Sequence, residues 1–157
     1  IWFQGCNIRC PGCCNPDYQP FEARHIMSLK DLIAVIKGAK EHFGIEGVTY
    51  SGGEPTCQQG LPFLTKGIKT LGLGVISFTG KNYEEVSEIL AGCDTVLDGT
   101  FKEEFIETKR RILGSTNQRI ICLTERYSNC IEEWFAKTDK IIEVNVGTDI
   151  VVNGDKI

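Results

Sequence analysis

The stretch CNIRCPGC, residues 6–13, places Cys6, Cys10 and Cys13 at C-x3-C-x2-C spacing close to the start of the chain. A structural zinc site needs four ligands, usually from two separated C-x-x-C knuckles, and no second knuckle is evident in this sequence. Three thiolates on one short loop instead favour a 4Fe–4S cluster whose fourth iron is left for another ligand. Zinc and reduced structural thiols are the alternatives.

The other five cysteines do not extend this motif. Cys14 follows Cys13 directly, so its side chain should leave the backbone in a different direction, and we do not expect it to be a fourth cluster ligand. The remaining four are predicted to be small core or surface residues: Cys57, Cys93, Cys122 and Cys130. Clustered thiols in this pattern favour a reducing compartment, so we expect a cytoplasmic protein.

The composition is that of a soluble globular domain. The chain has 157 residues, of which 41% are hydrophobic and 24% charged, with a net charge of −4. The sequence has no basic block of the kind that would indicate a nucleic-acid partner. It also has no apolar run that approaches the ~18 residues of a membrane span. The first residues do not have the features of a signal peptide. Because the chain opens on Ile1 within a strand-like run, we expect residues 1–157 to be one domain that lacks its extreme N-terminus.

Strand-like and helix-like patterns alternate along the chain, with a period of roughly 25 residues. Strands are expected at residues 1–3, 47–50, 73–78, 94–97, 119–123 and 141–144. Helices are expected from Ser28 to Gly44, over 58–71, after Asn82 and from Ser128 to about residue 137. This alternation predicts an α/β fold, a partial (βα)6-type barrel with a mostly parallel sheet in a single domain. Residues 150–157 are expected to form a hairpin with a type I′ turn at Asn153-Gly154.

Polar or glycine-rich segments follow four of the expected strands. They are the cysteine loop, Ser51-Gly52-Gly53-Glu54-Pro55, Thr79-Gly80 and Asp98-Gly99. The carboxyl ends of parallel strands meet at one edge of a sheet, which is where α/β folds bind their ligands. We therefore expect these four segments to lie close together.

The Gly-Gly-Glu-Pro segment, residues 52–55, is the second motif. Two glycines after a strand let the backbone approach a ligand closely and present N–H and C=O groups to it. A ligand amine would need such acceptors, and the Glu54 carboxylate could assist them. Alone, this segment is a weak signal, because a plain βα turn can have the same sequence. Its position one βα unit downstream of C-x3-C-x2-C makes it a strong signal of a ligand-binding turn.

Together the two motifs resemble the radical S-adenosylmethionine superfamily. The similarity is greatest to the small activating enzymes of glycyl radical enzymes, above all the anaerobic ribonucleotide reductase activating proteins. Residues 78–85, 96–101 and 114–119 also look like landmarks of that family, so the resemblance covers about residues 1–123. It implies a radical S-adenosylmethionine barrel of the 4Fe–4S single cluster type.

The resemblance implies that Cys6, Cys10 and Cys13 hold the 4Fe–4S cluster. The open iron would chelate the amino and carboxylate groups of S-adenosylmethionine. An electron from the reduced cluster would then cleave the sulfonium bond, giving methionine and a 5′-deoxyadenosyl radical. In activating enzymes this radical removes a hydrogen from a glycine of a large partner protein.

Further S-adenosylmethionine contacts are implied by matching position. Gly52, Gly53 and Glu54 would support the amino group, while backbone groups of Gly12 and Cys14 would contact the rest of the cofactor. Many superfamily members carry an aromatic residue where this chain has Gly12, so the adenine contacts are left undefined.

Three further residues are candidates at the same edge. Asp98 is expected either to contact the ligand or a cation at the sheet edge, or to be a helix- or turn-capping residue before Gly99. Asn117 and Arg119 are expected either to face the substrate mouth or to form a strand-entry turn with a surface charge.

The leading functional prediction is glycyl-radical activation of an anaerobic enzyme, most of all a ribonucleotide reductase, with a flavodoxin-type or other reductant. The first alternative is a radical S-adenosylmethionine enzyme that acts on a small molecule, as a deazapurine synthase does, or on a peptide. The second is a non-catalytic iron–sulfur or zinc module.

Overall fold

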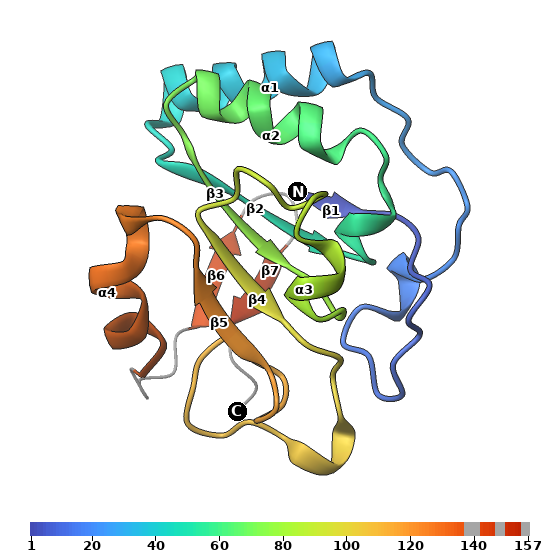
Figure 1. Cartoon of the computed structure of the whole chain (residues 1–157). Coiled ribbons are helices and arrows are strands. Elements are labelled where there is room, and N and C mark those ends of the chain that lie inside the picture. The colour runs from blue at the N-terminus through green and yellow to red at the C-terminus, as the bar shows by residue number, and fades with distance from the viewer. Residues whose placement is uncertain (137–141, 147–149, 155–157) are drawn as a thin grey trace.

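The computed structural model describes residues 1–136, 142–146 and 150–154. Its main sheet has five strands in the order β1 (Trp2–Phe3), β2 (Gly47–Gly52), β3 (Gly74–Phe78), β4 (Thr95–Asp98) and β5 (Arg119–Cys122). Its α-helices are α1 (Leu29–Phe43), α2 (Leu61–Thr70), α3 (Tyr83–Val86) and α4 (Glu125–Ala136). Short 3-10 turns occupy Pro16–Tyr18, Pro55–Cys57 and Glu103–Phe105. The predicted α/β fold with a mostly parallel sheet is confirmed (Figure 1).

Strands β1 to β4 are parallel and lie in sequence order, whereas β5 runs antiparallel to β4. A parallel neighbour requires the chain to cross back along the sheet, usually as a helix. No α-helix lies between β4 and β5, because residues 99–118 form a loop with only a 3-10 turn. The chain therefore re-enters the sheet from the edge that it left, and the fifth strand is reversed.

The predicted C-terminal turn is wrong. Strands β6 (Ile142–Val146) and β7 (Ile150–Gly154) form an antiparallel pair, in which Asn153 lies opposite Glu143 and Gly154 opposite Ile142. The Asn-Gly pair is thus inside a strand. The five residues of β6 pair with β7 along its whole length, so these cross-strand contacts outweigh the local turn preference of Asn-Gly.

Local signals set most helix boundaries. Ser28 caps α1, since its hydroxyl accepts the Asp31 N–H at 3.2 Å, and Gly44 ends the helix in the left-handed region at φ 65°. Helix α2 begins at Leu61 because a 3-10 turn precedes it, and α4 begins at Glu125 rather than at Ser128.

The two faces of the sheet bury different side chains. On one face Tyr50, Val75 and Val96 pack with α1 and α2, which lie side by side in Figure 1. On the other face Leu97 packs with Ile131 of α4 and with a residue of the 99–118 loop. Each fully buried apolar side chain of this kind contributes ~1.5–3 kcal/mol to stability. No helix among the residues described is long and apolar enough to cross a membrane.

Helix α4 is anchored at the amino edge of the sheet. The Tyr127 hydroxyl lies so close to Gly47 that an added Cβ there would be 2.7 Å away, and Gly74 has even less room. Arg126 donates to the carbonyls of Glu46 and Gly72, both at 3.1 Å. These contacts fix α4 to the amino edge, where Arg126 and Tyr127 also line a second, smaller cleft of about 470 Å³.

Candidate functional site

A cleft of about 590 Å³ opens at the carboxyl edge, within the usual ~300–1,000 Å³ of small-molecule sites. It brings together the cysteine loop, the turn after β2, the turn after β3 and the 99–118 loop. The predicted site residues that line it are Cys6, Cys10, Gly12, Cys13, Cys14, Gly52, Gly53 and Glu54. Segments up to about 100 residues apart in the sequence therefore share one cavity, as the strand-edge pattern predicts.

Backbone hydrogen bonds close the base of the cysteine loop. The N–H of Gly5 donates to the Tyr18 carbonyl at 2.8 Å, and the N–H of Cys6 donates to the Gln19 carbonyl at 2.9 Å. Gln4 adds a side-chain bond to the Pro20 carbonyl at 2.6 Å. The loop that carries the three thiols is therefore fixed at both ends.

The interior of the loop turns sharply. Gly12 has φ 67° and Arg9 has φ 54°, both in the left-handed region, where a non-glycine residue such as Arg9 is uncommon. This winding turns the chain between Cys6 and Cys13 and lets both thiols, with that of Cys10, line one cleft.

The electrostatics of the thiols fit a metal cluster. Burial raises the pKa of the Cys10 thiol most; the backbone N–H of Phe101 lowers that pKa, while Cys13 and Cys6 raise it further. Repulsion between thiolates in a partly desolvated cleft is relieved by a cationic metal centre, and metal binding would release the thiol protons. Three cysteines without a fourth ligand match a cluster with one open iron.

Metal-ligand geometry is not already complete. Among residues 1–136, 142–146 and 150–154, no three histidine, cysteine or acidic side chains converge at metal-binding distances. The three thiols would therefore turn toward a common centre when a cluster binds. The thiol of Cys13 also accepts the Asn15 N–H at 3.4 Å, the kind of hydrogen bond to sulfur that tunes a cluster.

The two glycines after β2 have a structural role that the sequence analysis did not anticipate. Gly52 has φ 98°, and a Cβ there would lie 2.5 Å from the backbone nitrogen of Phe3. A Cβ on Gly53 would lie 2.6 Å from the Tyr18 carbonyl oxygen and closer still to that of Gly5. These glycines let the turn pack directly on the base of the cysteine loop, while they also line the cleft.

Glu54 is buried, with 2% of its surface exposed, and its carboxylate is held by four hydrogen bonds. Its Oε1 accepts from the Thr56 N–H at 3.1 Å, the Thr56 hydroxyl at 2.6 Å and the Thr79 hydroxyl at 2.8 Å. Its Oε2 accepts from the Gly80 N–H at 2.9 Å. Oε2 therefore keeps more acceptor capacity than Oε1 for a donor in the cleft.

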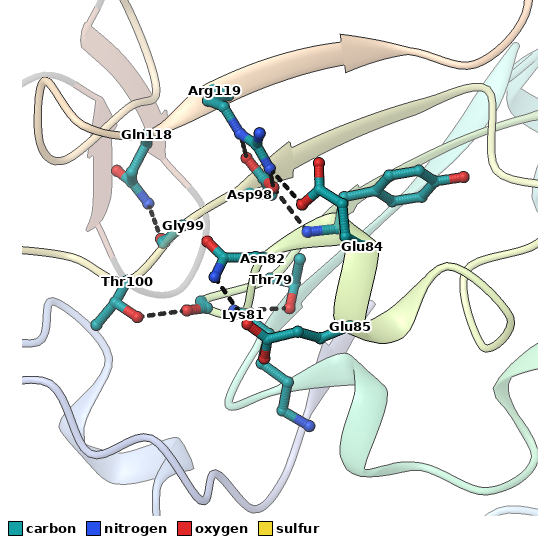
Figure 2. A network of polar contacts seen from close by, with 12 residues as sticks. Thr79, Lys81, Asn82, Glu84, Glu85, Asp98, Gly99, Thr100, Gln118 and Arg119 are labelled. Carbon is teal, nitrogen blue, oxygen red and sulfur yellow. Dashed lines mark hydrogen bonds and ion pairs between the residues drawn. The ribbon is translucent and has the colours of Figure 1, made fainter.

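Asp98 is fully buried and lies outside the cleft lining. It accepts the Tyr83 N–H at 2.7 Å at the start of α3, and it pairs with the Nε of Arg119 at 2.9 Å and with Nη2 of the same residue (Figure 2). Arg119 also bonds Glu84 at 2.9 Å. Asp98 raises the pKa of Arg119, and Arg119 lowers that of Glu84. These contacts favour the capping alternative for Asp98.

Asn117 and Arg119 also lie outside the lining, whereas their neighbour Gln118 is part of it. Asn117 donates to the Thr100 carbonyl at 2.9 Å. Gln118 donates to the Gly99 carbonyl at 2.9 Å (Figure 2). The segment thus ties β5 to the exit of β4. Sequence reasoning missed Gln118 because its side chain bonds backbone groups, a partner that composition does not reveal.

Apolar side chains that were not predicted as site residues form other parts of the wall. Phe78, Phe101 and Ile112 line the cleft, as does Trp2, whose ring lies 5.4 Å from that of Tyr18. Phe78 is the last residue of β3 and Phe101 follows β4, so their position at the exits of these strands was the available signal. Ile112 carried none, because residues 100–114 have no periodic pattern.

An ion pair between Glu107 and Arg110, called the strap below, holds the part of the loop that carries Ile112. Glu107 accepts from Nε of Arg110 at 2.6 Å, and Arg110 donates to the carbonyls of Gln118 at 3.1 Å and Thr116 at 3.0 Å. The backbone N–H of Lys109 lowers the pKa of Glu107 most; burial opposes this, and Arg110 lowers the pKa further, to about 2.

This strap predicts a pH dependence. A carboxyl group whose pKa falls from 4.5 to about 2 on folding stabilises the folded state fully above about pH 4.5, and the stabilisation is lost as the pH falls toward 2. We expect Glu107→Gln to lower the melting temperature at pH 7 and to flatten its dependence on pH below 4.5. Thermal melts across this range test it, with the exposed Glu104→Gln as control. Equal slopes for wild type and Glu107→Gln would contradict the role of the strap.

The sheet, the cleft and the three thiols define a class: an α/β domain with a metal-cofactor site at the carboxyl edge of its strands. The chain belongs to the family of 4Fe–4S single cluster domains, which matches residues 1–121. With its relatives it is part of the radical S-adenosylmethionine superfamily, as the two motifs predicted. Membership brings two cofactors, a 4Fe–4S cluster and S-adenosylmethionine.

Several curated proteins are similar. A pyruvate formate-lyase-activating enzyme of Clostridium pasteurianum is 34% identical over 101 residues, 62% of this chain and 42% of that protein. A 7-carboxy-7-deazaguanine synthase of Aquifex aeolicus is 35% identical over 75 residues, 48% and 32% of the two chains. A probable GTP 3′,8-cyclase of Saccharolobus islandicus is 39% identical over 59 residues, 38% and 19%. The matched part is less than half the length of each relative.

Proposed function

We propose that Cys6, Cys10 and Cys13 hold the 4Fe–4S cluster and that the turn at residues 52–54 binds the methionyl end of S-adenosylmethionine beside it. The observation that carries this proposal is the single cleft that both segments line. Only three cysteines are supplied by the loop, so the open iron and the Gly-Gly-Glu turn can share one ligand.

The chemistry and the protein's part in it are separable. When bound, the reduced cluster supplies the electron that splits S-adenosylmethionine into methionine and a carbon radical able to remove hydrogen from a substrate. Glu54 would accept a hydrogen bond from the amino group through Oε2, which has spare acceptor capacity. Phe78, Phe101 and Ile112 would exclude water from the rest of the cofactor, and backbone groups of Gly12 and Cys14 would contact it.

The substrate that we propose is a glycine of a partner enzyme, so that the protein makes a glycyl radical on an anaerobic enzyme such as a ribonucleotide reductase. The likeness to a pyruvate formate-lyase-activating enzyme over 62% of the chain supports this. A flavodoxin-type reductant would supply the electron, and a reducing, cytoplasmic setting suits the exposed Cys14, Cys122 and Cys130.

A second function, radical chemistry on a small molecule, is supported by the other relatives. Their names give a deazaguanine synthase and a GTP cyclase, and both are similar to this chain over a shorter stretch. Both functions would use the same cleft. They would differ in whether a glycine of a partner enzyme or a small molecule enters it.

Anaerobic reconstitution of the full-length protein, reduction and addition of S-adenosylmethionine test the common step. We expect 5′-deoxyadenosine to form, and we expect a glycine-centred EPR doublet when the partner enzyme is added. Metal analysis that gives zinc without iron and sulfide, or no 5′-deoxyadenosine, would contradict the enzyme proposal. Turnover of a small molecule without any partner would favour the second function.

A further inference from the structure

We infer that Thr79 is a positioning residue, which holds the Glu54 carboxylate so that Oε2 meets the amino group of S-adenosylmethionine. This inference rests on the proposed function. Thr79 follows β3 directly, is buried, and donates its hydroxyl hydrogen to Oε1 of Glu54 at 2.8 Å. The two residues come from neighbouring strands and meet at the cleft.

The direction of this hydrogen bond is set by a second one. The N–H of Lys81 donates to the Thr79 hydroxyl oxygen at 3.1 Å, which is drawn in Figure 2. A hydroxyl has one hydrogen to donate, and with Lys81 occupying an acceptor position that hydrogen is directed to Glu54. Thr79 is therefore an oriented donor.

The consequence falls on the carboxylate. Three donors saturate Oε1 of Glu54, and Gly80 alone holds Oε2. The terminal torsion of a glutamate has a broad energy profile, so the orientation of its carboxylate plane is set by the donors around it. Loss of the Thr79 hydroxyl would leave Oε1 bound by Thr56 alone, so the plane would tilt and Oε2 would move from its position.

The turn that carries Thr79 is itself fixed by the exit of β4. The N–H of Thr79 donates to the Leu97 carbonyl at 2.9 Å. The Thr100 hydroxyl donates to the Gly80 carbonyl at 2.6 Å (Figure 2). Gly80 also faces the cysteine loop, because a Cβ there would lie 2.6 Å from the end of the Ile8 side chain. The turn thus joins the cluster loop to Glu54.

Binding of S-adenosylmethionine to the cluster-loaded protein, measured anaerobically by calorimetry, is the test. We expect Thr79→Val to weaken binding about tenfold, the usual effect of losing one hydrogen bond to a charged group. Thr79→Ser, which keeps the hydroxyl, is expected to bind as the wild type does. The double variant Glu54→Gln/Thr79→Val should bind no more weakly than Glu54→Gln, because Thr79 acts through Glu54.

Iron content and melting temperature are measured on every variant, and Thr79→Ala replaces Thr79→Val if the valine protein does not load with iron. If the variant without the hydroxyl bound S-adenosylmethionine as tightly as the wild type does, the inference would be overturned and the proposed function would stand. Additive losses in the double variant would also overturn it. Failure of the wild type to bind S-adenosylmethionine would overturn both.

Discussion

Replacement of Cys6, Cys10 or Cys13 by alanine is expected to abolish the 4Fe–4S cluster completely. Each thiol is one of only three that the loop supplies, and all three line the same cleft. A cluster with only two thiolate ligands would have a second iron without a protein ligand, and we expect such a cluster not to persist. Iron and sulfide per chain after anaerobic reconstitution measure this, and far-UV circular dichroism checks that each variant is folded.

Cys14→Ala is the matched control, because Cys14 is exposed and adjoins the third ligand. We expect it to keep a full cluster. Cys57→Ala is a second control, since the Cys57 thiol donates to the Asn7 side chain at 3.3 Å and so touches the loop without being predicted as a ligand. Loss of the cluster in Cys14→Ala would show that the ligands are assigned wrongly.

Gly53→Ala is expected to destabilise the fold by about 3 kcal/mol, the upper part of the range for an overpacked site. The new Cβ would meet backbone oxygens of Tyr18 and Gly5, which cannot turn aside as the end of a side chain can. It would also strain the bond from the Gly53 N–H to the Phe3 carbonyl, now 2.7 Å. The midpoint of denaturant unfolding measures the loss.

Gly38→Ala provides the control for this prediction. Gly38 lies inside α1, and a Cβ there would have nothing within 4 Å. Alanine in a helix is better than glycine by about 0.5–1 kcal/mol, so this variant should be more stable than the wild type. Equal stability of Gly53→Ala and wild type would refute the packing role of the turn.

The sequence by itself determined the parts of the site that depend on spacing along the chain. Three thiols within eight residues are close enough to bind one metal centre, so CNIRCPGC predicted a cluster loop without any knowledge of the fold. Periodicity placed β2 and β3, and therefore put Gly52, Gly53 and Thr79 at one edge of a parallel sheet. Asn153-Gly154 shows the limit of such local signals, since pairing with β6 overrode its turn preference.

Only the tertiary structure decided which polar groups meet. It reversed β5, bound Asp98 to Arg119 and Tyr83, and joined Glu54 to a threonine 25 residues away. The reason is physical: ligand spacing and strand periodicity are properties of neighbouring residues, whereas a hydrogen bond across the sheet depends on how separate strands are registered and packed. The loop CNIRCPGC could therefore be recognised from the sequence, but the support of Glu54 beside it could not.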